Sequence, residues 1–388
     1  MRVALDATAI PHRRAGAGNY IFKLLEALAA VDRENEYVFF AKRAHVEELD
    51  IEQPNVRLVP VDHPSRPLRL LWEQSVLPYR LRRLEVEVLH SPHYTMPLRK
   101  ACRSVVTIPD MTFELLPSMH GLPKRLFFRA MMRWSARHAD RLIAISESTR
   151  SDVVRILGVP PDHVVAIPLA ADPAFRPMPP ALVAPVCAGL GIVPGRYVCY
   201  VGVLEPRKNL PLLVQAYGAL PRGLQDMPLV IAGKQGWMYQ EILERVTALG
   251  LRDRVIFTGY VPQDHLPALY NGARVVVYPS VYEGFGLPVL EAMQCGAPVV
   301  TTRSSSLPEV AGDGALLVDP RDEAGLTAAL ATLMTDDALA ADLSRRALRQ
   351  AGRFSWERCA RETLAVYRSV GGPSAGAGGQ AGRRSGPA

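Results

Sequence analysis

Two adjacent basic residues in the C-terminal half of the chain could bind a phosphate group. Arg207 and Lys208 follow an apolar run, Tyr197–Val201, which ends at Gly202, and a helical pattern begins near Leu210. Cations beside the start of a helix bring fixed positive charge and free backbone N–H groups to one point. This arrangement suits a diphosphate, although the dipeptide by itself would equally suit a solvated turn.

Two glutamates form a second candidate group. Glu283 and Glu291 enclose the string Gly284–Pro288, directly after the apolar run Arg274–Tyr278. Two glycines in this string let a ligand approach the backbone closely, and the proline can begin a helix. Carboxylates accept paired hydrogen bonds from sugar or ribose hydroxyls. The string therefore predicts a site for a phosphorylated, hydroxyl-rich ligand, whereas Glu291 alone would be explained by the helix dipole.

Both groups follow short apolar runs that alternate with helical patterns along the chain. Continuous apolar runs are typical of parallel strands in sheets covered on both faces. The repetition predicts an α/β protein with two doubly wound, Rossmann-like domains and a ligand cleft between them. The predicted strands are Arg2–Ala7, Tyr37–Ala41, Val56–Val61, Val86–His90, Ser104–Ile108, Arg141–Ile145 and Val164–Pro168 in the first half, and Tyr197–Val201, Leu229–Ala232, Val255–Thr258, Arg274–Tyr278, Pro298–Thr301 and Ala315–Val318 in the second.

The expected domains are residues 1–170 and 196–354, joined by a linker at 171–195. The stretch Pro168–Pro194 contains seven prolines, so it is predicted to have little regular structure. Residues 355–370 are predicted to form a last helix with Ser355 as its N-cap. Residues 371–388 are rich in Gly, Ala, Ser and Pro and are predicted to be a disordered tail.

The composition is that of a globular protein and argues against several classes. Of the 388 residues, 48% are apolar and 21% are charged, and no run of about 18 apolar residues lacks a charge. The N-terminus reaches Asp6 after three apolar residues, so no signal peptide is expected. The five cysteines form no C-x-x-C pair, which argues against a zinc site or a disulfide framework and favours a cytoplasmic protein.

The net charge of +7 is concentrated in the N-terminal half. Between His63 and Arg141 the sequence has fourteen Lys or Arg and six acids. This patch suits the inner face of a cell membrane or a phosphorylated acceptor, and solvated helix faces explain it equally well. Its section from Lys124 to Arg141 is interleaved with apolar residues, which predicts either a membrane-contacting helix or a buried one facing the other domain. No nucleic-acid-binding motif accompanies it, so nucleic acid is not an expected partner.

The basic pair and the two glutamates, with seven residues between them, resemble the donor site of family-4 retaining glycosyltransferases of the GT-B fold. The resemblance covers nearly the whole chain. The local sequence of these motifs is similar to that of bacterial mannosyltransferases of polysaccharide assembly. Further matching segments are Arg14–Tyr20, Thr107–Phe113, Ala144–Thr149, Thr258–Tyr260 with Leu266, and Ser305–Val310.

This resemblance implies an enzyme that moves a hexose, with mannose the first expectation, from a GDP- or UDP-sugar to a carbohydrate or lipid-linked acceptor. It also implies a C-terminal helix that crosses back to the N-terminal domain. No metal or other cofactor is implied, because two cations and a helix N-terminus supply positive charge and the chain lacks an Asp-x-Asp cluster.

Individual roles follow from the same resemblance. Arg207 and Lys208 would neutralise the diphosphate and stabilise the leaving group, Glu283 would bind donor-sugar hydroxyls, and Glu291 would bind the ribose. Asp110 completes the expected catalytic group. The other implied donor-binding residues are Gly16 and Gly18 from the opposite domain, and Gly202, Tyr260, Leu266, Phe285, Gly286 and Leu287.

Pro109 departs from the family pattern. The family usually has a histidine here, beside the donor sugar, and a proline side chain neither donates nor accepts a hydrogen bond. His12, His90 and His93 are candidates to replace it, and Asn19 stands where arginine is common. The alternative function is therefore a catalytically weak or inactive sugar-nucleotide-binding protein. A dinucleotide-dependent oxidoreductase is disfavoured, because the N-terminal glycine loop lacks the third glycine of that motif.

Overall fold

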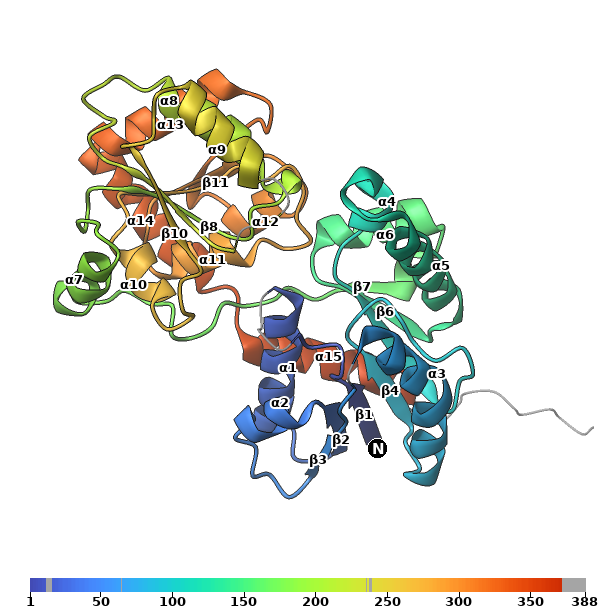
Figure 1. Cartoon of the computed structure of the whole chain (residues 1–388). Coiled ribbons are helices and arrows are strands. Elements are labelled where there is room, and N and C mark those ends of the chain that lie inside the picture. The colour runs from blue at the N-terminus through green and yellow to red at the C-terminus, as the bar shows by residue number, and fades with distance from the viewer. Residues whose placement is uncertain (12–15, 64, 235, 237–238, 372–388) are drawn as a thin grey trace, which may run out of the picture.

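The computed structural model describes residues 1–11, 16–63, 65–234, 236 and 239–371. Within these residues the chain forms two α/β domains, each built on a parallel sheet with helices packed against it (Figure 1). Each strand predicted from the sequence overlaps an observed strand. The predicted GT-B architecture of two Rossmann-like domains is therefore confirmed.

The described part of the N-terminal domain contains a seven-stranded sheet in the order β3-β2-β1-β4-β5-β6-β7. In β1 the side chains of Val3, Ala4 and Leu5 are all fully buried, which explains why the run is continuous instead of alternating. The strands are β1 (Arg2–Asp6), β2 (Glu36–Ala41), β3 (Val56–Pro60), β4 (Val88–Ser91), β5 (Arg103–Ile108), β6 (Arg141–Ala144) and β7 (Val164–Ala166). The helices are α1 (Ala17–Val31), α2 (Arg43–Glu48), α3 (Arg66–Arg83), α4 (Thr112–Leu115), α5 (Leu122–His138) and α6 (Glu147–Leu157), with short turns η1 (Pro117–Met119) and η2 (Pro161–His163).

The C-terminal domain repeats this design with six strands among the described residues, in the order β10-β9-β8-β11-β12-β13. The chain leaves β8 in one direction along the sheet and β11 in the other, so a crevice opens between the carboxyl ends of these two strands. The strands are β8 (Val198–Val201), β9 (Leu229–Ala232), β10 (Val255–Gly259), β11 (Val275–Tyr278), β12 (Val299–Thr302) and β13 (Ala315–Val318). The helices are η3 (Pro206–Lys208), α8 (Leu210–Gly218), α9 (Tyr239–Ala248), α10 (Leu266–Asn271), α11 (Leu287–Gln294), α12 (Leu307–Ala311), α13 (Glu323–Thr335) and α14 (Asp337–Ala351).

The last helix returns to the N-terminal domain, as predicted. Helix α15 (Trp356–Gly371) packs along α1 and against β4 and β5 in the middle of the N-terminal sheet (Figure 1). The Ser355 hydroxyl accepts a hydrogen bond from the Arg358 N–H at 3.1 Å, in agreement with its prediction as the N-cap. Tyr367 is fully buried, and its hydroxyl lies 2.6 Å from Nδ1 of His90 on β4. The tail was predicted to begin at Gly371, but this residue is the last of α15; residues 372–388 lie outside the described residues.

The expectation of little regular structure in the proline-rich connection is wrong for its second part. Residues Pro180–Gly189 form helix α7, which packs against α10 of the C-terminal domain. Pro180 stands at the first helical position, where its missing N–H is not needed, so this proline favours the helix. Val183 and Cys187 are buried on its inner face.

Helix α5 corrects a second expectation. Its N-terminal half leaves Leu122, Leu126 and Phe127 exposed at 56%, 56% and 37%, so the alternative of a buried helix facing the other domain is wrong for this half. In the described parts of the chain, no helix is both long and apolar enough to cross a membrane. All five cysteines lie within those parts and are unpaired.

Candidate functional site

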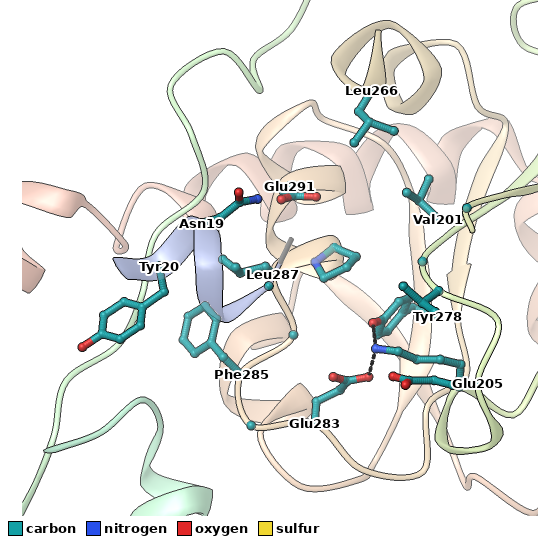
Figure 2. A pocket seen from close by; sticks show the side chains of 18 of the residues that line it. Asn19, Tyr20, Val201, Glu205, Leu266, Tyr278, Glu283, Phe285, Leu287 and Glu291 are labelled. Atoms are coloured by element: carbon teal, nitrogen blue, oxygen red, sulfur yellow. Dashed lines mark hydrogen bonds and ion pairs between the residues drawn. The ribbon is translucent and has the colours of Figure 1, made fainter. Parts of the chain in front are cut away.

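A cavity of about 510 Å³ lies between the two domains, at the carboxyl ends of their strands (Figure 2). Its walls come from the start of α1 and the segments after β5, β6 and β7 in one domain, and from segments after β8, β9, β10 and β11 in the other. The residues predicted from the sequence that line it are Gly16, Asp110, Gly202, Arg207, Lys208, Tyr260, Leu266, Glu283, Phe285, Gly286, Leu287 and Glu291.

The basic pair lies in the turn η3, directly after β8 and before α8. Lys208 is only 5% exposed, and its Nζ donates to the Tyr278 hydroxyl and, at 2.6 Å, to the Glu283 carboxylate (Figure 2). Arg207 Nη1 donates to the same carboxylate, and its Nη2 lies 2.7 Å from Glu205. The two cations that were predicted to face a diphosphate are thus paired with two carboxylates, and the four charges cancel.

The Glu283 carboxylate is at the centre of this ion-pair network. Burial would raise its pKa, but Arg207 and Lys208, together with the Ser280 hydroxyl that donates at 2.6 Å, lower the pKa to about 2. Burial lowers the pKa of Lys208, and the Glu283 carboxylate opposes that shift. A phosphate that reaches Arg207 and Lys208 therefore competes with carboxylates that already hold them.

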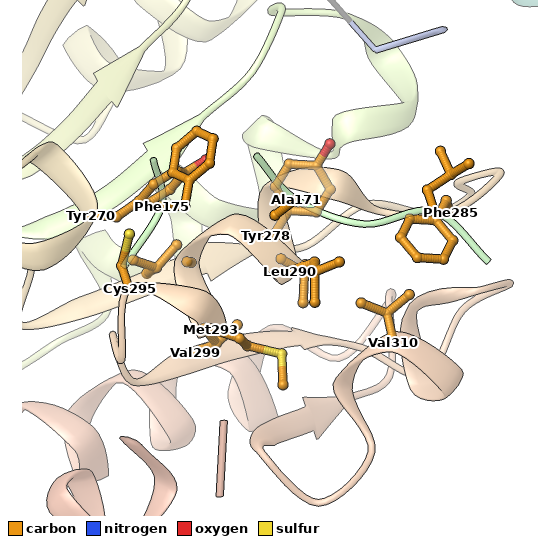
Figure 3. Packing of buried hydrophobic residues seen from close by; sticks show 14 of the residues in the cluster. Ala171, Phe175, Tyr270, Tyr278, Phe285, Leu290, Met293, Cys295, Val299 and Val310 are labelled. Atoms are coloured by element: carbon orange, nitrogen blue, oxygen red, sulfur yellow. The ribbon is translucent and has the colours of Figure 1, made fainter. Parts of the chain in front are cut away.

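Glu291 lies on α11, which begins directly after Gly286. Gly286 has a φ of 105°, a left-handed conformation that suits glycine. Leu290 and Met293 bury the opposite side of this short helix in the C-terminal core (Figure 3). The Glu291 carboxylate accepts a hydrogen bond from the Tyr270 hydroxyl at 3.3 Å, and burial raises its pKa to about 7. The glutamate thus stands in the cavity wall on a rigidly anchored helix.

The N-terminal domain contributes Pro109 and Asp110 to the cavity. Asp110 accepts hydrogen bonds from the backbone N–H of Thr112 at 2.9 Å and from its hydroxyl at 2.7 Å, which starts α4. Asn19 extends from α1 towards Glu291 (Figure 2). Pro109 leaves no polar side chain at the position where the family pattern has histidine.

Two of the three histidines suggested as replacements, His90 and His93, do not line the cavity. His90 is buried between Tyr367 and Thr107, and burial lowers its pKa to about 3. His93 lies 3.3 Å from Asp6 in the N-terminal core. Neither lines the cavity. His12 lies outside the described residues.

Gly18 also differs from its prediction. It is buried against Pro11, where an added Cβ would lie 2.8 Å from the proline ring, and it does not line the cavity. A glycine-rich motif shows that the backbone needs room, but not on which side the room is needed.

Sequence reasoning missed several cavity residues. Glu205 stands two residues before Arg207, so its proximity to the basic pair was visible, but its pairing was not. Tyr278 was included only as the last residue of a predicted strand. The C-terminal domain also contributes Lys234 and Gln263, which no motif indicated.

Outside the cavity, a cluster of two carboxylates and one histidine has the geometry of a metal site. Among the described residues, Asp6, Glu73 and His93 bring their ligand atoms within 4.8 Å of one another in the N-terminal core. Arg69 Nη1 lies 2.9 Å from the Glu73 carboxylate and 3.6 Å from that of Asp6. A guanidinium thus already supplies the positive charge that these carboxylates require.

Comparison with known proteins decides the family. Residues 14–175 match the Glycosyltransferase Family 4 model, and residues 192–350 match the Glycosyl transferases group 1 model. Over 382 residues the chain is 32% identical to the O-antigen chain mannosyltransferase B of Escherichia coli, with 95% of this chain and 100% of that protein covered. The chain is a family 4 glycosyltransferase. Membership of this family excludes the alternative of a dinucleotide-dependent oxidoreductase.

Other similar proteins agree. Over 222 residues the glycosyltransferase is 36% identical to the serotype-specific mannosyltransferase WbdA of Escherichia coli. This match covers 56% of the present chain and 27% of that larger protein. The fold of the present chain is shared with sucrose-phosphate synthase from Thermosynechococcus elongatus (TM-score 0.76, 22% identity, 95% and 98% of the chains covered). It is shared also with HepE from Anabaena in complex with UDP and glucose (TM-score 0.74, 19% identity, 95% and 100% covered).

Proposed function

We propose that this glycosyltransferase moves a mannosyl residue from a nucleotide diphosphate mannose, GDP-mannose first, to a glycan or lipid-linked acceptor in polysaccharide synthesis. The cavity between the domains carries the proposal, because it joins two cations, two buried glutamates and a glycine-rich helix start at one switch point. The full-length similarity to a mannosyltransferase supports mannose as the sugar.

The positions of the charged groups suggest how the donor binds. The diphosphate would contact Arg207 and Lys208, and it brings negative charge that replaces part of their pairing with Glu283 and Glu205. Glu283 would then accept hydrogen bonds from sugar hydroxyls, and Glu291 from the ribose diol. In this way the ion-pair network keeps the two cations compensated both with and without the donor.

Membership of family 4 leads us to propose transfer with retention of configuration. The carboxylates among the described lining residues are Asp110, Glu205, Glu283 and Glu291, and each has a hydrogen-bond or ion-pair partner. We assign none of them as the base that takes the acceptor proton. In the proposed step the bond from the sugar C1 to the phosphate breaks, the acceptor oxygen bonds to C1 on the same face, and its proton goes to the leaving phosphate.

Helix α5 suggests where a lipid-linked acceptor approaches. Exposed Leu122, Leu126 and Phe127 stand among exposed Lys124 and Arg133, a combination that suits the surface of an anionic membrane. Sedimentation with vesicles tests this contact: phosphatidylglycerol vesicles should bind the protein, phosphatidylcholine vesicles should not, and Leu126→Glu should reduce the binding. Equal sedimentation with both lipids would exclude the charge-dependent contact.

A donor screen tests the proposed function. Thermal unfolding with GDP-mannose, UDP-glucose and UDP-N-acetylglucosamine should show stabilisation by GDP-mannose, because a ligand specific for the folded state raises its stability. Arg207→Ala should abolish that stabilisation, whereas Arg222→Ala, a control at an exposed position, should retain it. The anomeric configuration of the product, measured by NMR with a mannose-containing acceptor, tests retention. Stabilisation by no nucleotide sugar would refute the proposal.

Pro109 defines the test for weak catalysis. If GDP-mannose binds but no acceptor yields a product, we expect Pro109→His to create measurable turnover at an unchanged donor affinity. Activity of the natural chain with any mannose-containing acceptor would instead show that catalysis needs no histidine at this position.

A further inference from the structure

Tyr282 connects the loop between β11 and α11 (residues 279–286, the donor loop) to the N-terminal domain. It directly precedes Glu283, but its side chain is 8% exposed and packs in a cluster whose other buried members all belong to the N-terminal domain. Its partners in this cluster include Met111 and Val153. The residue next to Glu283 is therefore anchored in the opposite domain's core.

The hydroxyl of Tyr282 is bonded to two N-terminal elements at once. It accepts a hydrogen bond from the backbone N–H of Met111 at 3.2 Å and donates one to the Asp152 carboxylate on α6 at 3.1 Å. Burial raises the pKa of the phenol, so the hydroxyl keeps the proton that it donates. Both bonds exist only while the two domains are in contact.

The backbone of Tyr282 contacts Arg207, one of the two cations proposed to bind the diphosphate. Its carbonyl accepts a hydrogen bond from Arg207 Nη1 at 3.2 Å and lies 3.3 Å from the Ser280 hydroxyl oxygen. The same Ser280 hydroxyl donates to Glu283. A movement of the Tyr282 side chain would therefore be transmitted to Arg207 and Glu283, the two residues proposed to face the donor.

Gly284, two residues after Tyr282, fits tightly against the other domain. The Gly284 carbonyl accepts a hydrogen bond from the Thr149 hydroxyl at 3.1 Å. A Cβ added to Gly284 would lie 2.0 Å from the Pro109 carbonyl oxygen and 3.0 Å from the Cβ of Asp110. The closed contact thus leaves no room for any side chain at position 284.

We propose that Tyr282 is a positioning residue that couples closure of the two domains to the placement of Arg207 and Glu283. When the domains are apart, the hydroxyl loses both partners and the donor loop loses its anchor. When they close, the two hydrogen bonds fix the loop and so place the cation and the carboxylate for the reaction. This role rests on the proposed glycosyl transfer, which it deepens by adding a conformational step before chemistry.

Tyr282→Phe tests the coupling in the full-length chain, because it removes the hydroxyl and keeps the ring. We expect kcat with GDP-mannose to fall about tenfold, and the Kd of GDP to change less than about threefold, since loss of a buried hydrogen-bonded group has an effect of this order. Tyr79→Phe, at a 62% exposed position on α3, is the matched control and should match the natural chain. An unchanged kcat in Tyr282→Phe would overturn the proposal.

A double substitution separates coupling from plain structural damage. Asp152→Ala removes the acceptor of the same hydroxyl, so its loss of kcat should not add to that of Tyr282→Phe. Additive losses would contradict a shared interaction.

Small-angle scattering measures the closure of the two domains and does not require turnover. Gly284→Ala should increase the radius of gyration with or without GDP-mannose, because its methyl group collides with the Pro109 carbonyl. An unchanged radius would overturn the closed contact on which the role of Tyr282 depends. Absence of nucleotide-sugar binding in the thermal screen would refute the proposed function instead, and the scattering comparison without ligand would still stand.

Discussion

Replacing Glu283 with glutamine tests the ion-pair network by its charge alone. The change keeps the shape of the side chain but leaves Arg207 and Lys208 with only Glu205 as a counter-charge. Lowering the carboxyl pKa from 4.5 to about 2 corresponds to about 3 kcal/mol in favour of the charged form in the folded protein. Because the folded pKa is the lower one, this stability is present above about pH 4.5 and is lost as the pH falls towards 2. At neutral pH, Glu283→Gln should therefore destabilise the protein by about 3 kcal/mol.

The same change should strengthen the binding of a nucleotide diphosphate. The four charges of the natural network cancel, whereas the variant has one uncompensated positive charge beside the phosphate position. An extra charge in a partly buried site contributes on the order of 1 kcal/mol, which corresponds to roughly fivefold tighter binding. Glu283→Gln should thus bind GDP more tightly while it loses transfer activity, because the sugar loses its carboxylate acceptor.

Thermal unfolding at neutral pH, with and without GDP, measures both effects. The variant should unfold several degrees below the natural chain, and GDP should stabilise it by a larger increment. Glu244→Gln, an exposed glutamate on α9, is the control and should change neither value. An unchanged unfolding temperature, or weaker GDP binding in the variant, would show that the network does not have the assigned electrostatic role.

Three further predictions concern the supports of the site. Burial raises the pKa of Glu291 to about 7, so the stability of the natural protein should decline as the pH rises from about 4.5 to 7, and Glu291→Gln should flatten that decline in thermal scans. Gly286→Ala should lower the urea-unfolding free energy by about 1–3 kcal/mol, because φ is 105° and the new Cβ would lie 2.7 Å from a Leu307 methyl group; an unchanged midpoint would mean that the loop adapts. Tyr367→Phe should lower stability by about 1–3 kcal/mol by leaving His90 Nδ1 without its partner, and calorimetry should find GDP affinity unchanged.

The strands and the location of the site could be predicted from sequence because both leave local signals. Buried parallel strands give continuous apolar runs, and glycine and proline mark the loops after β8 and β11. The topology then explains why two motifs that are 75 residues apart meet, since these strands are neighbours at the switch point. The roles assigned to individual residues remain predictions.

The features that were missed depend on contacts between distant segments. The pairing of Arg207 and Lys208 with Glu283 follows from the packing of two loops, and the sequence reports each loop only by itself. The anchoring of Tyr282 in the opposite domain is of the same kind. Helix α7 was missed for a different reason, because prolines were counted as breakers without regard to their position, and Pro180 is at a helix start.

The crossover helix has a consequence for the order in which the protein matures. Helix α15 is synthesised after both domains, yet Ala360 and Tyr367 on it are fully buried together with α1 and β4. During translation the N-terminal domain therefore emerges first, but its apolar surface at α1 and β4 is covered only once residues 356–371 follow. A ribosome that stalls before residue 355 would release a domain with an open core, a substrate for chaperones. The core of the N-terminal domain is thus complete only after residues 356–371 have been synthesised.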